Sequence, residues 1–435
     1  MFHQRISTDL AAEIWSTVKR SGCLAEDVKS FVVHDLGRMR DRLQNLQSVF
    51  PRQSRHTLAI KANPLVEILR VAVGCGVGLE AASIEEVELA VAAGCPAEQI
   101  IFDSPAKTRD EIQHCLKLGV HLNVDNFDEL ERIGSLYQTV ASASTVGLRI
   151  NPEVGVGTIA ITSVGGTGSK FGVSVSKDHD RILDAFVKYD WLVGLHAHVG
   201  SQGCALDLLC RSAARLQQLR REIVEHTGRR IPLVNIGGGL PAAYDDAIEP
   251  PSPSLYAEQL AIHAPDLMGD EVTLMTEFGR AVQAGCGVAF SRVEYVRRQS
   301  QRVVGDLTDS DHSMAVIHLG ADMFLRPVYR PDDWKHEYAL LDASGLLKTQ
   351  DSRQTTIAGP LCFAGDILTR EALMPEPRVG DWIVIRDCGA YTLSMWSRHC
   401  SRGLPPVVGY DASNQSVSLL HRGETPEDVV RFWSR

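Results

Sequence analysis

Polar residues at the ends of short apolar runs are the most informative feature of this sequence. Lys61 follows one such run, and a partly desolvated lysine amine can form a Schiff base with an aldehyde. His198 offers an imidazole that can cover the face of a planar ring. Glu277 offers a carboxylate that can hydrogen-bond a protonated pyridine nitrogen. These three side chains predict a site for an aldehyde attached to a pyridine ring.

A phosphate site completes the pattern. Three consecutive glycines follow another apolar run, and they would let backbone N–H groups approach a phosphate closely; they are Gly237, Gly238 and Gly239. Ser201 is a further candidate phosphate ligand, and Arg280 is a candidate ligand of either the phosphate or a substrate carboxylate. An aldehyde, a pyridine ring and a phosphate are the parts of pyridoxal 5′-phosphate (PLP), so we predict PLP as the cofactor.

Eight short apolar runs, separated by stretches of helical periodicity, must position these residues. The first run covers residues 57–60 and the last covers 272–276. Strand and helix alternating eight times is the pattern of a (β/α)8 TIM barrel, in which the C-terminal ends of the strands form the active site. Other polar residues stand near the ends of the intervening runs: Glu80, Asp103, Asp125, Arg149, His198 and Asn235. The pattern therefore predicts that Lys61 and Glu277 face one cavity.

The chain is too long for a barrel alone, because its 435 residues exceed the roughly 250 of a typical barrel. We expect an N-terminal segment, 1–35, that packs with a C-terminal β domain, then the barrel over 36–287 and the β domain over 288–435. Runs at 303–307, 314–319 and 382–386 are short and separated by turns, as in β structure. Residues 151–174 and 245–255 are predicted to be irregular loops.

Composition excludes several classes of function. The formal net charge of −10 argues against nucleic acid and anionic membranes as partners. No apolar run reaches the about eighteen residues of a membrane span, and the N-terminal residues lack the pattern of a secretory signal. The ten cysteines are scattered without metal-ligand spacing, so we predict no metal site and a cytoplasmic protein.

Several short motifs make the chain resemble the barrel-fold (fold type III) PLP decarboxylases, the group of diaminopimelate, ornithine and arginine decarboxylases. The motifs are Ala59-Ile60-Lys61-Ala62-Asn63, Arg149-Ile150-Asn151-Pro152, Ser169-Lys170-Phe171-Gly172, His198-Val199-Gly200-Ser201, Gly237-Gly238-Gly239, Gly359-Pro360-Leu361-Cys362 with Asp366, and Gly389-Ala390-Tyr391. The resemblance is nearest to the diaminopimelate branch. It implies an α/β barrel that binds PLP, followed by a β domain like that of alanine racemases.

The resemblance also implies roles for individual residues. Lys61 would bind the cofactor aldehyde, His198 would stack on the pyridine ring, and Glu277 would contact its nitrogen. Tyr391 would join Ser201, the glycines and Arg280 around the phosphate. The resemblance implies a homodimer with shared active sites, in which Cys362 and Asp366 of one subunit reach the site of the other. Cys362 would then protonate the carbanion left after CO2 departs.

Substrate choice is where the chain departs from its relatives. Arg326 and Tyr329 resemble the segment with which diaminopimelate decarboxylases grip the distal carboxylate, but the tyrosine lies one residue nearer the arginine. Phe363 replaces the glutamate that usually follows the catalytic cysteine and meets the distal ammonium. We therefore expect decarboxylation of a basic or D-amino acid, or of a specialised intermediate such as a siderophore precursor. A true meso-diaminopimelate decarboxylase, a racemase and a catalytically silent regulatory homologue remain alternatives.

Overall fold

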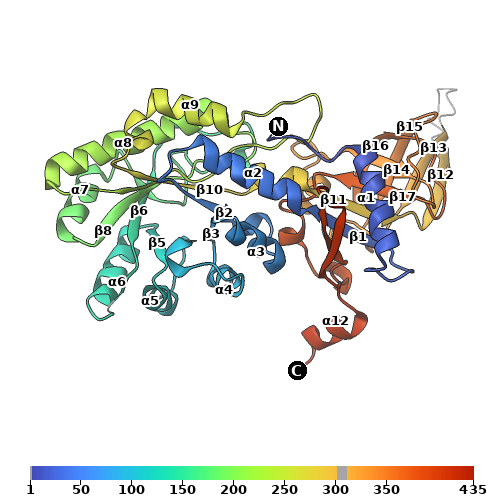
Figure 1. Cartoon of the computed structure of the whole chain (residues 1–435), viewed down its shortest axis with the longest axis horizontal. Helices are drawn as coiled ribbons and strands as arrows, with labels where there is room; N and C mark the ends of the chain where they lie inside the picture. Colours follow the sequence, from blue (N-terminus) through green and yellow to red (C-terminus); the bar gives the residue numbers. More distant parts are fainter. Residues whose placement is uncertain (1, 141, 301–310) are drawn as a thin grey trace. The chain divides into compact units, whose positions relative to one another are not determined.

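The computed structural model describes residues 2–140, 142–300 and 311–435. Two compact units make up the chain (Figure 1). The first consists mainly of Arg40–Ala242 and Pro250–Val282, and the second of Gln4–Met39, Ala243–Glu249 and Gln283–Arg435. The domain boundaries expected at residues 36 and 287 stay predictions.

The first unit is a closed barrel of eight parallel strands. Each strand pairs in parallel with the next, and the last pairs with the first. The barrel strands are β2 (Arg55–Ala59), β3 (Gly78–Ala81), β4 (Ile100–Asp103), β5 (His121–Val124), β6 (Val146–Asn151), β8 (Leu192–His196), β9 (Leu233–Asn235) and β10 (Thr273–Phe278). The predicted (β/α)8 architecture is confirmed, with each strand at the predicted apolar run.

Helices precede, connect and follow the barrel strands (Figure 1). They are α2 (Leu36–Val49), α3 (Val66–Gly74), α4 (Ile84–Ala92), α5 (Arg109–Leu118), α6 (Phe127–Tyr137), α7 (His179–Lys188), α8 (Leu206–Thr227), α9 (Pro253–His263) and the short α10 (Arg280–Gln283). The local sequence determines where several of these helices begin. At the start of α5, Thr108 and Glu111 form a capping box, in which the side chain of each residue accepts the backbone N–H of the other. Such caps fix the helix end of the loop that follows each preceding strand.

One predicted loop is shorter than expected. Residues 245–255 were expected to be irregular because of their prolines, but α9 begins at Pro253. Proline is tolerated at the first helical position, where its missing N–H would have no partner in the helix, and the Ser252 side chain caps the Leu255 N–H. The other predicted loop, 151–174, is irregular apart from the single turn η3 (Ala160–Thr162) and the short strand β7 (Val173–Ser174).

The second unit is rich in β structure, as predicted. Its six-stranded sheet has the order β14 (Tyr338–Leu341), β17 (Trp382–Arg386), β11 (Gly287–Arg292), β1 (Ser30–Asp35), β18 (Val407–Asp411), β19 (Ser416–His421). A four-stranded sheet has the order β12 (Tyr295–Ser300), β13 (Asp311–Val316), β15 (Arg353–Ala358), β16 (Ile367–Met374). The described residues of this unit also form the α-helices α1 (Thr8–Ser21), α11 (Leu325–Tyr329) and α12 (Pro426–Trp433).

The N-terminal segment belongs to the core of this unit. Strand β1 pairs antiparallel with β11 and parallel with β18. The rings of Phe31 and Phe290 stack with centroids 4.9 Å apart, and Trp15 of α1 packs edge-on against Trp382 at 5.7 Å. The predicted run at 382–386 is β17, and 314–319 overlaps β13, whereas the run at 303–307 lies outside the described residues.

No helix in the described part of the chain combines the length and the apolar composition that crossing a bilayer requires.

Candidate active site

Lys61 stands at the C-terminal end of the first barrel strand. It lies on the single turn η1 (Ile60–Ala62) that follows β2, and its Nζ donates to both carboxylate oxygens of Glu80 on β3, at 2.7 and 2.8 Å. The Glu80 side chain is fully buried and that of Lys61 is 38% exposed. Burial raises the pKa of Glu80, and the Lys61 charge opposes that rise. The amine is thus held in an ion pair where it is still accessible.

His198 lies two residues beyond the end of β8 and is half-buried. Its Nδ1 accepts the backbone N–H of Gly238 at 3.1 Å. Desolvation lowers the pKa of His198 well below its ordinary value, and the charges of Lys61 and Arg149 act in the same direction. The imidazole is therefore neutral at neutral pH, with its proton on Nε2 because Nδ1 is an acceptor.

The glycine turn after β9 is built to bring backbone close to these groups. Gly237 has φ +67°, and its N–H donates to the Asn235 side-chain oxygen at 2.9 Å. A Cβ on Gly237 would lie 2.6 Å from His198 Nδ1, and one on Gly238 would lie 2.4 Å from the Glu277 carbonyl oxygen. Gly239 has φ +108°, a conformation that side chains disfavour. Only glycine fits this turn.

Ser201 and Arg280 meet beside the barrel mouth. The Arg280 Nε donates to Ser201 Oγ at 3.1 Å, and Arg280 is 3% exposed. The buried guanidinium is hydrogen-bonded to the hydroxyl, and both groups can donate to a phosphate. Together with the backbone N–H groups of the glycine turn, they suit a phosphate group. The donor set of the barrel therefore fits PLP.

We expect Gly238→Ala to weaken PLP binding by at least about tenfold, because the added methyl group must displace the β10 backbone beside it. Titration of the apo protein with PLP, followed by absorbance, measures this. Gly74→Ala is the matched control, since a Cβ there would meet nothing within 4 Å. Unchanged PLP affinity and melting temperature in Gly238→Ala would contradict the proposed role of the turn.

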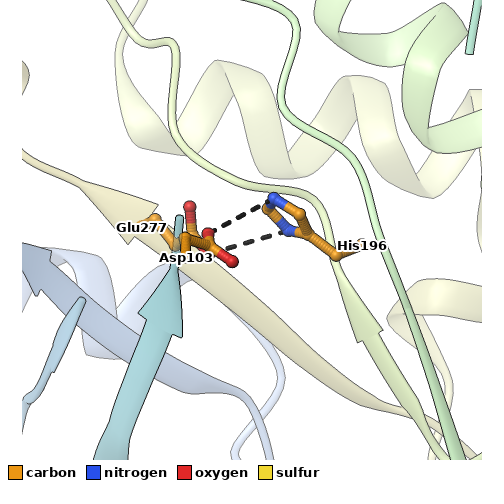
Figure 2. Close-up of side chains that lie close together, drawn as sticks. All are labelled: Asp103, His196 and Glu277. Atoms are coloured by element: carbon orange, nitrogen blue, oxygen red, sulfur yellow. Dashed lines mark ion pairs between the residues drawn. The ribbon is translucent and has the colours of Figure 1, made fainter. Parts of the chain in front are cut away.

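Glu277 belongs to a buried cluster with Asp103 and His196, called here the Asp103–His196–Glu277 cluster (Figure 2). His196 Nε2 lies 3.4 Å from Asp103 Oδ2, and its Nδ1 lies 3.6 Å from Glu277 Oε1. The Asn235 side-chain amide donates to the same Glu277 oxygen at 2.6 Å. Strands β4, β8, β9 and β10 thus converge on one carboxyl group.

The protonation states within this cluster follow from its burial. Desolvation raises the pKa of Glu277 well above its ordinary value, and the charges of Asp103 and Glu80 add to the rise. Burial alone would also raise the pKa of Asp103, but electrostatic interactions with His196 and Arg149 lower it. Desolvation lowers the pKa of His196 to about 4. The cluster therefore holds an ionised Asp103, a neutral His196 and a protonated Glu277.

Arg149 on β6 connects the barrel to the long loop after it. Its guanidinium lies 4.5 Å from the centre of the Phe171 ring, and its NH1 is 3.7 Å from Asp125 Oδ1. The same Asp125 oxygen accepts the Gly172 N–H at 3.2 Å. These contacts explain the Ser169-Lys170-Phe171-Gly172 motif as the part of the loop that folds against the barrel strands.

The remaining predicted site residues belong to the second unit. Cys362 is exposed, and the turn that carries it is organised by the buried Asp366. The Asp366 carboxylate accepts backbone N–H groups of Ala321 at 2.6 Å and Leu361 at 2.7 Å. Burial raises the pKa of Asp366, and these hydrogen bonds oppose the rise. Within its own subunit Asp366 shapes the cysteine turn.

Aromatic rings surround the predicted substrate residues of this unit. The Arg326 guanidinium lies between the rings of Trp334 at 4.5 Å and Tyr391 at 4.4 Å. Tyr391 has φ +57°. Tyr329 does not share this arrangement: its ring stacks on Phe363, with centroids 6.0 Å apart and planes inclined by 19°. Tyr329, which lies one residue nearer to Arg326 than the corresponding tyrosine of the diaminopimelate branch, thus contacts Phe363.

Sequence reasoning missed part of this arrangement. Glu80, Asp103, Arg149 and Asn235 were recognised as residues at strand ends but received no role. His196 was not recognised, although the pattern His196-Ala197-His198 carried a signal, because alternate residues of a strand point to the same face.

Known proteins resemble the chain over most of its length. The family described as "Pyridoxal-dependent decarboxylase, pyridoxal binding domain" matches residues 36–284. A diaminopimelate decarboxylase of Zymomonas mobilis is 30% identical over 379 residues, covering 86% of this chain and 84% of the relative. One of Helicobacter pylori is 27% identical over 410 residues, covering 92% and 95%.

A solved structure supports the fold. The diaminopimelate decarboxylase of Helicobacter pylori (an I148L mutant complexed with L-lysine) superposes with a TM-score of 0.82 at 24% identity, covering 94% of this chain and 97% of that one. At this identity the likeness concerns the fold alone. Together with the family match and the barrel site, these findings show that the chain belongs to the fold type III pyridoxal-dependent decarboxylases, near the diaminopimelate branch, and is an amino-acid decarboxylase with PLP as its cofactor.

Proposed function

We propose that this decarboxylase acts on an amino acid other than meso-diaminopimelate: a basic amino acid, a D-amino acid such as D-ornithine or D-lysine, or a specialised biosynthetic intermediate. The observation that carries the proposal is Phe363, directly after the candidate acid Cys362. An aromatic ring there offers no carboxylate to a distal ammonium group. A site without that carboxylate discriminates against meso-diaminopimelate, whose distal end carries an ammonium and a carboxylate together, whereas an aromatic ring face can still attract the lone side-chain cation of a basic amino acid.

The chain's own residues supply binding and proton transfer. PLP, when bound, supplies an electron sink for the electrons of the bond between Cα and the carboxylate. Lys61 would hold the aldehyde end of the cofactor, His198 would cover its ring and Glu277 would hydrogen-bond the ring nitrogen. The Cys362 thiol delivers a proton to the substrate Cα after CO2 has left.

The distal part of the proposed pocket is apolar. The Phe363 ring is 38% exposed and lies between Tyr329, on which it stacks, and His399, whose ring it meets edge-on at 6.2 Å. Such a surface packs well against a methylene chain, and its ring faces attract a diffuse cation. These contacts support a substrate whose distal end does not carry both an ammonium and a carboxylate group, as that of meso-diaminopimelate does.

We expect the wild-type kcat/KM for meso-diaminopimelate to lie at least about 100-fold below that of the best substrate. The measurement is CO2 release from meso-diaminopimelate and from the D and L forms of lysine, ornithine and arginine. It also separates decarboxylation from racemisation. Phe363→Glu should raise kcat/KM for meso-diaminopimelate by about tenfold, because a carboxylate then meets the ammonium. Phe363→Leu, which stays apolar, should give no such gain.

A true meso-diaminopimelate decarboxylase is the second candidate. It is favoured by the names of the relatives and by Arg326, whose segment resembles the one with which the diaminopimelate branch grips the distal carboxylate. If the wild type turns over meso-diaminopimelate better than every other amino acid in the panel, this second function replaces the first.

A further inference from the structure

Two members of the Asp103–His196–Glu277 cluster have no role in the proposed function. Asp103 is 7% exposed, Glu277 is 4% exposed and His196 is fully buried. Figure 2 shows the imidazole facing both carboxyl groups. Its two nitrogens lie 3.4 and 3.6 Å from the nearest carboxyl oxygens, longer than a good N–H···O hydrogen bond. Buried polar groups normally have short hydrogen bonds. We therefore expect a second state of this cluster in which the distances between the imidazole nitrogens and the carboxyl oxygens are shorter.

Two adjacent buried carboxyl groups cannot both ionise without a compensating positive charge. Carboxyl oxygens of Asp103 and Glu277 lie within 4.8 Å of each other, and the charge of Asp103 raises the pKa of Glu277, so one of the two groups carries a proton. The proposed function, however, needs Glu277 as a carboxylate that hydrogen-bonds the protonated ring nitrogen of PLP. A positive charge between the two carboxylates would then offset their repulsion, in addition to the charges of Lys61 and Arg149.

We propose that His196, oriented by Asp103, becomes protonated between the two carboxylates when PLP binds and thereby keeps Glu277 ionised as the hydrogen-bond partner of the ring nitrogen. This inference rests on the proposed function of Glu277. His196 and Asp103 are positioning residues in this scheme, since they act through Glu277. The Glu277 proton passes to the ring nitrogen, and one further proton enters from solvent to His196.

Placement of the imidazole supports this scheme. The Asp103 charge already raises the pKa of His196 against the effect of burial, and a second carboxylate at the Glu277 position, 3.6 Å from Nδ1, would raise it further. Other charged or titratable groups act on the cluster from neighbouring elements: Lys61 on η1, Glu80 on β3, His121 on β5, Arg149 on β6 and His198 after β8. His196 differs from these five groups because its two ring nitrogens each lie nearest to a different carboxyl group of the cluster.

Binding of two cofactors to the apo protein tests the inference. One is PLP, and the other is its analogue with carbon in place of the ring nitrogen. His196→Gln should weaken PLP binding by about tenfold and analogue binding by less than about threefold, because only PLP requires an ionised Glu277. Adding Asp103→Asn to His196→Gln should restore most of the PLP affinity, since it removes the charge that His196 offsets.

His121→Gln is the matched control. His121 is another buried imidazole of the same barrel, and it contacts Thr145 and Asn123. The His121→Gln variant should either leave binding of PLP and of the analogue unchanged or weaken both equally. Equal losses for PLP and the analogue in His196→Gln, or additive losses in the double variant, would overturn the inference.

Wild-type protein offers a test that needs no variant. Calorimetry in buffers of different ionisation enthalpy counts the protons taken up on binding. Above the pKa of the ring nitrogen in free PLP, binding of PLP should take up about one proton more than binding of the analogue. Equal uptake would refute the role of His196. Failure of the wild type to bind PLP, or to release CO2 from any amino acid, would instead refute the proposed function.

Discussion

Lys61→Ala should reduce amino-acid turnover to the detection limit and remove the visible absorbance of bound PLP, because it removes the amine that we propose to hold the cofactor aldehyde. The fold should survive, since the Lys61 side chain is 38% exposed. The fully buried Glu80 loses its cation but can take up a proton, as its raised pKa already favours. The measurements are the absorbance spectrum, CO2 release and the melting temperature.

Lys61→Arg separates the two roles of the lysine. A guanidinium keeps the positive charge beside Glu80 but stays protonated and is not a nucleophile. This variant should therefore keep the wild-type melting temperature more closely than Lys61→Ala and be equally inactive. Turnover together with visible cofactor absorbance in either variant would show that another residue binds the aldehyde.

The barrel was predictable because its signal is local and repeated. Each apolar run contains residues that form buried strands, and the intervening segments have helical periodicity with recognisable caps such as Thr108. A polar residue at a strand end, such as Lys61 or Glu277, can then be assigned to the active-site face from the fold alone. The start of α9 was missed because three prolines outweighed the capping signal of Ser252.

The pairing of side chains inside the barrel was not predictable. Glu80 holds Lys61, and His196 lies between Asp103 and Glu277, because strands distant in the sequence are brought into register. The register His196↔Asn235 and Met275↔Asn235 is a property of the closed sheet. No local pattern in the sequence carries that information, so the charge state of Glu277 could be derived only from the structure.

We propose that the protein acts as a homodimer in which Cys362 of one subunit completes the active site built around Lys61 of the other. Lys61 belongs to the barrel unit and Cys362 to the second unit, where it is exposed. The Asp366 carboxylate fixes its turn through the backbone N–H groups of Leu361 and Ala321. A thiol presented on a rigid, exposed turn is suited to insertion into a neighbouring subunit.

Mixing inactive Lys61→Ala and Cys362→Ala proteins should then regenerate about a quarter of wild-type activity. Random pairing gives mixed dimers in about half of the population, and each mixed dimer has one intact site of two. Each variant alone should stay inactive. Cys400→Ala is the matched control, because Cys400 is another exposed cysteine of the same unit, and this variant should keep its activity without mixing. If subunit exchange is verified and no activity returns, both residues act within one subunit and the shared site is wrong.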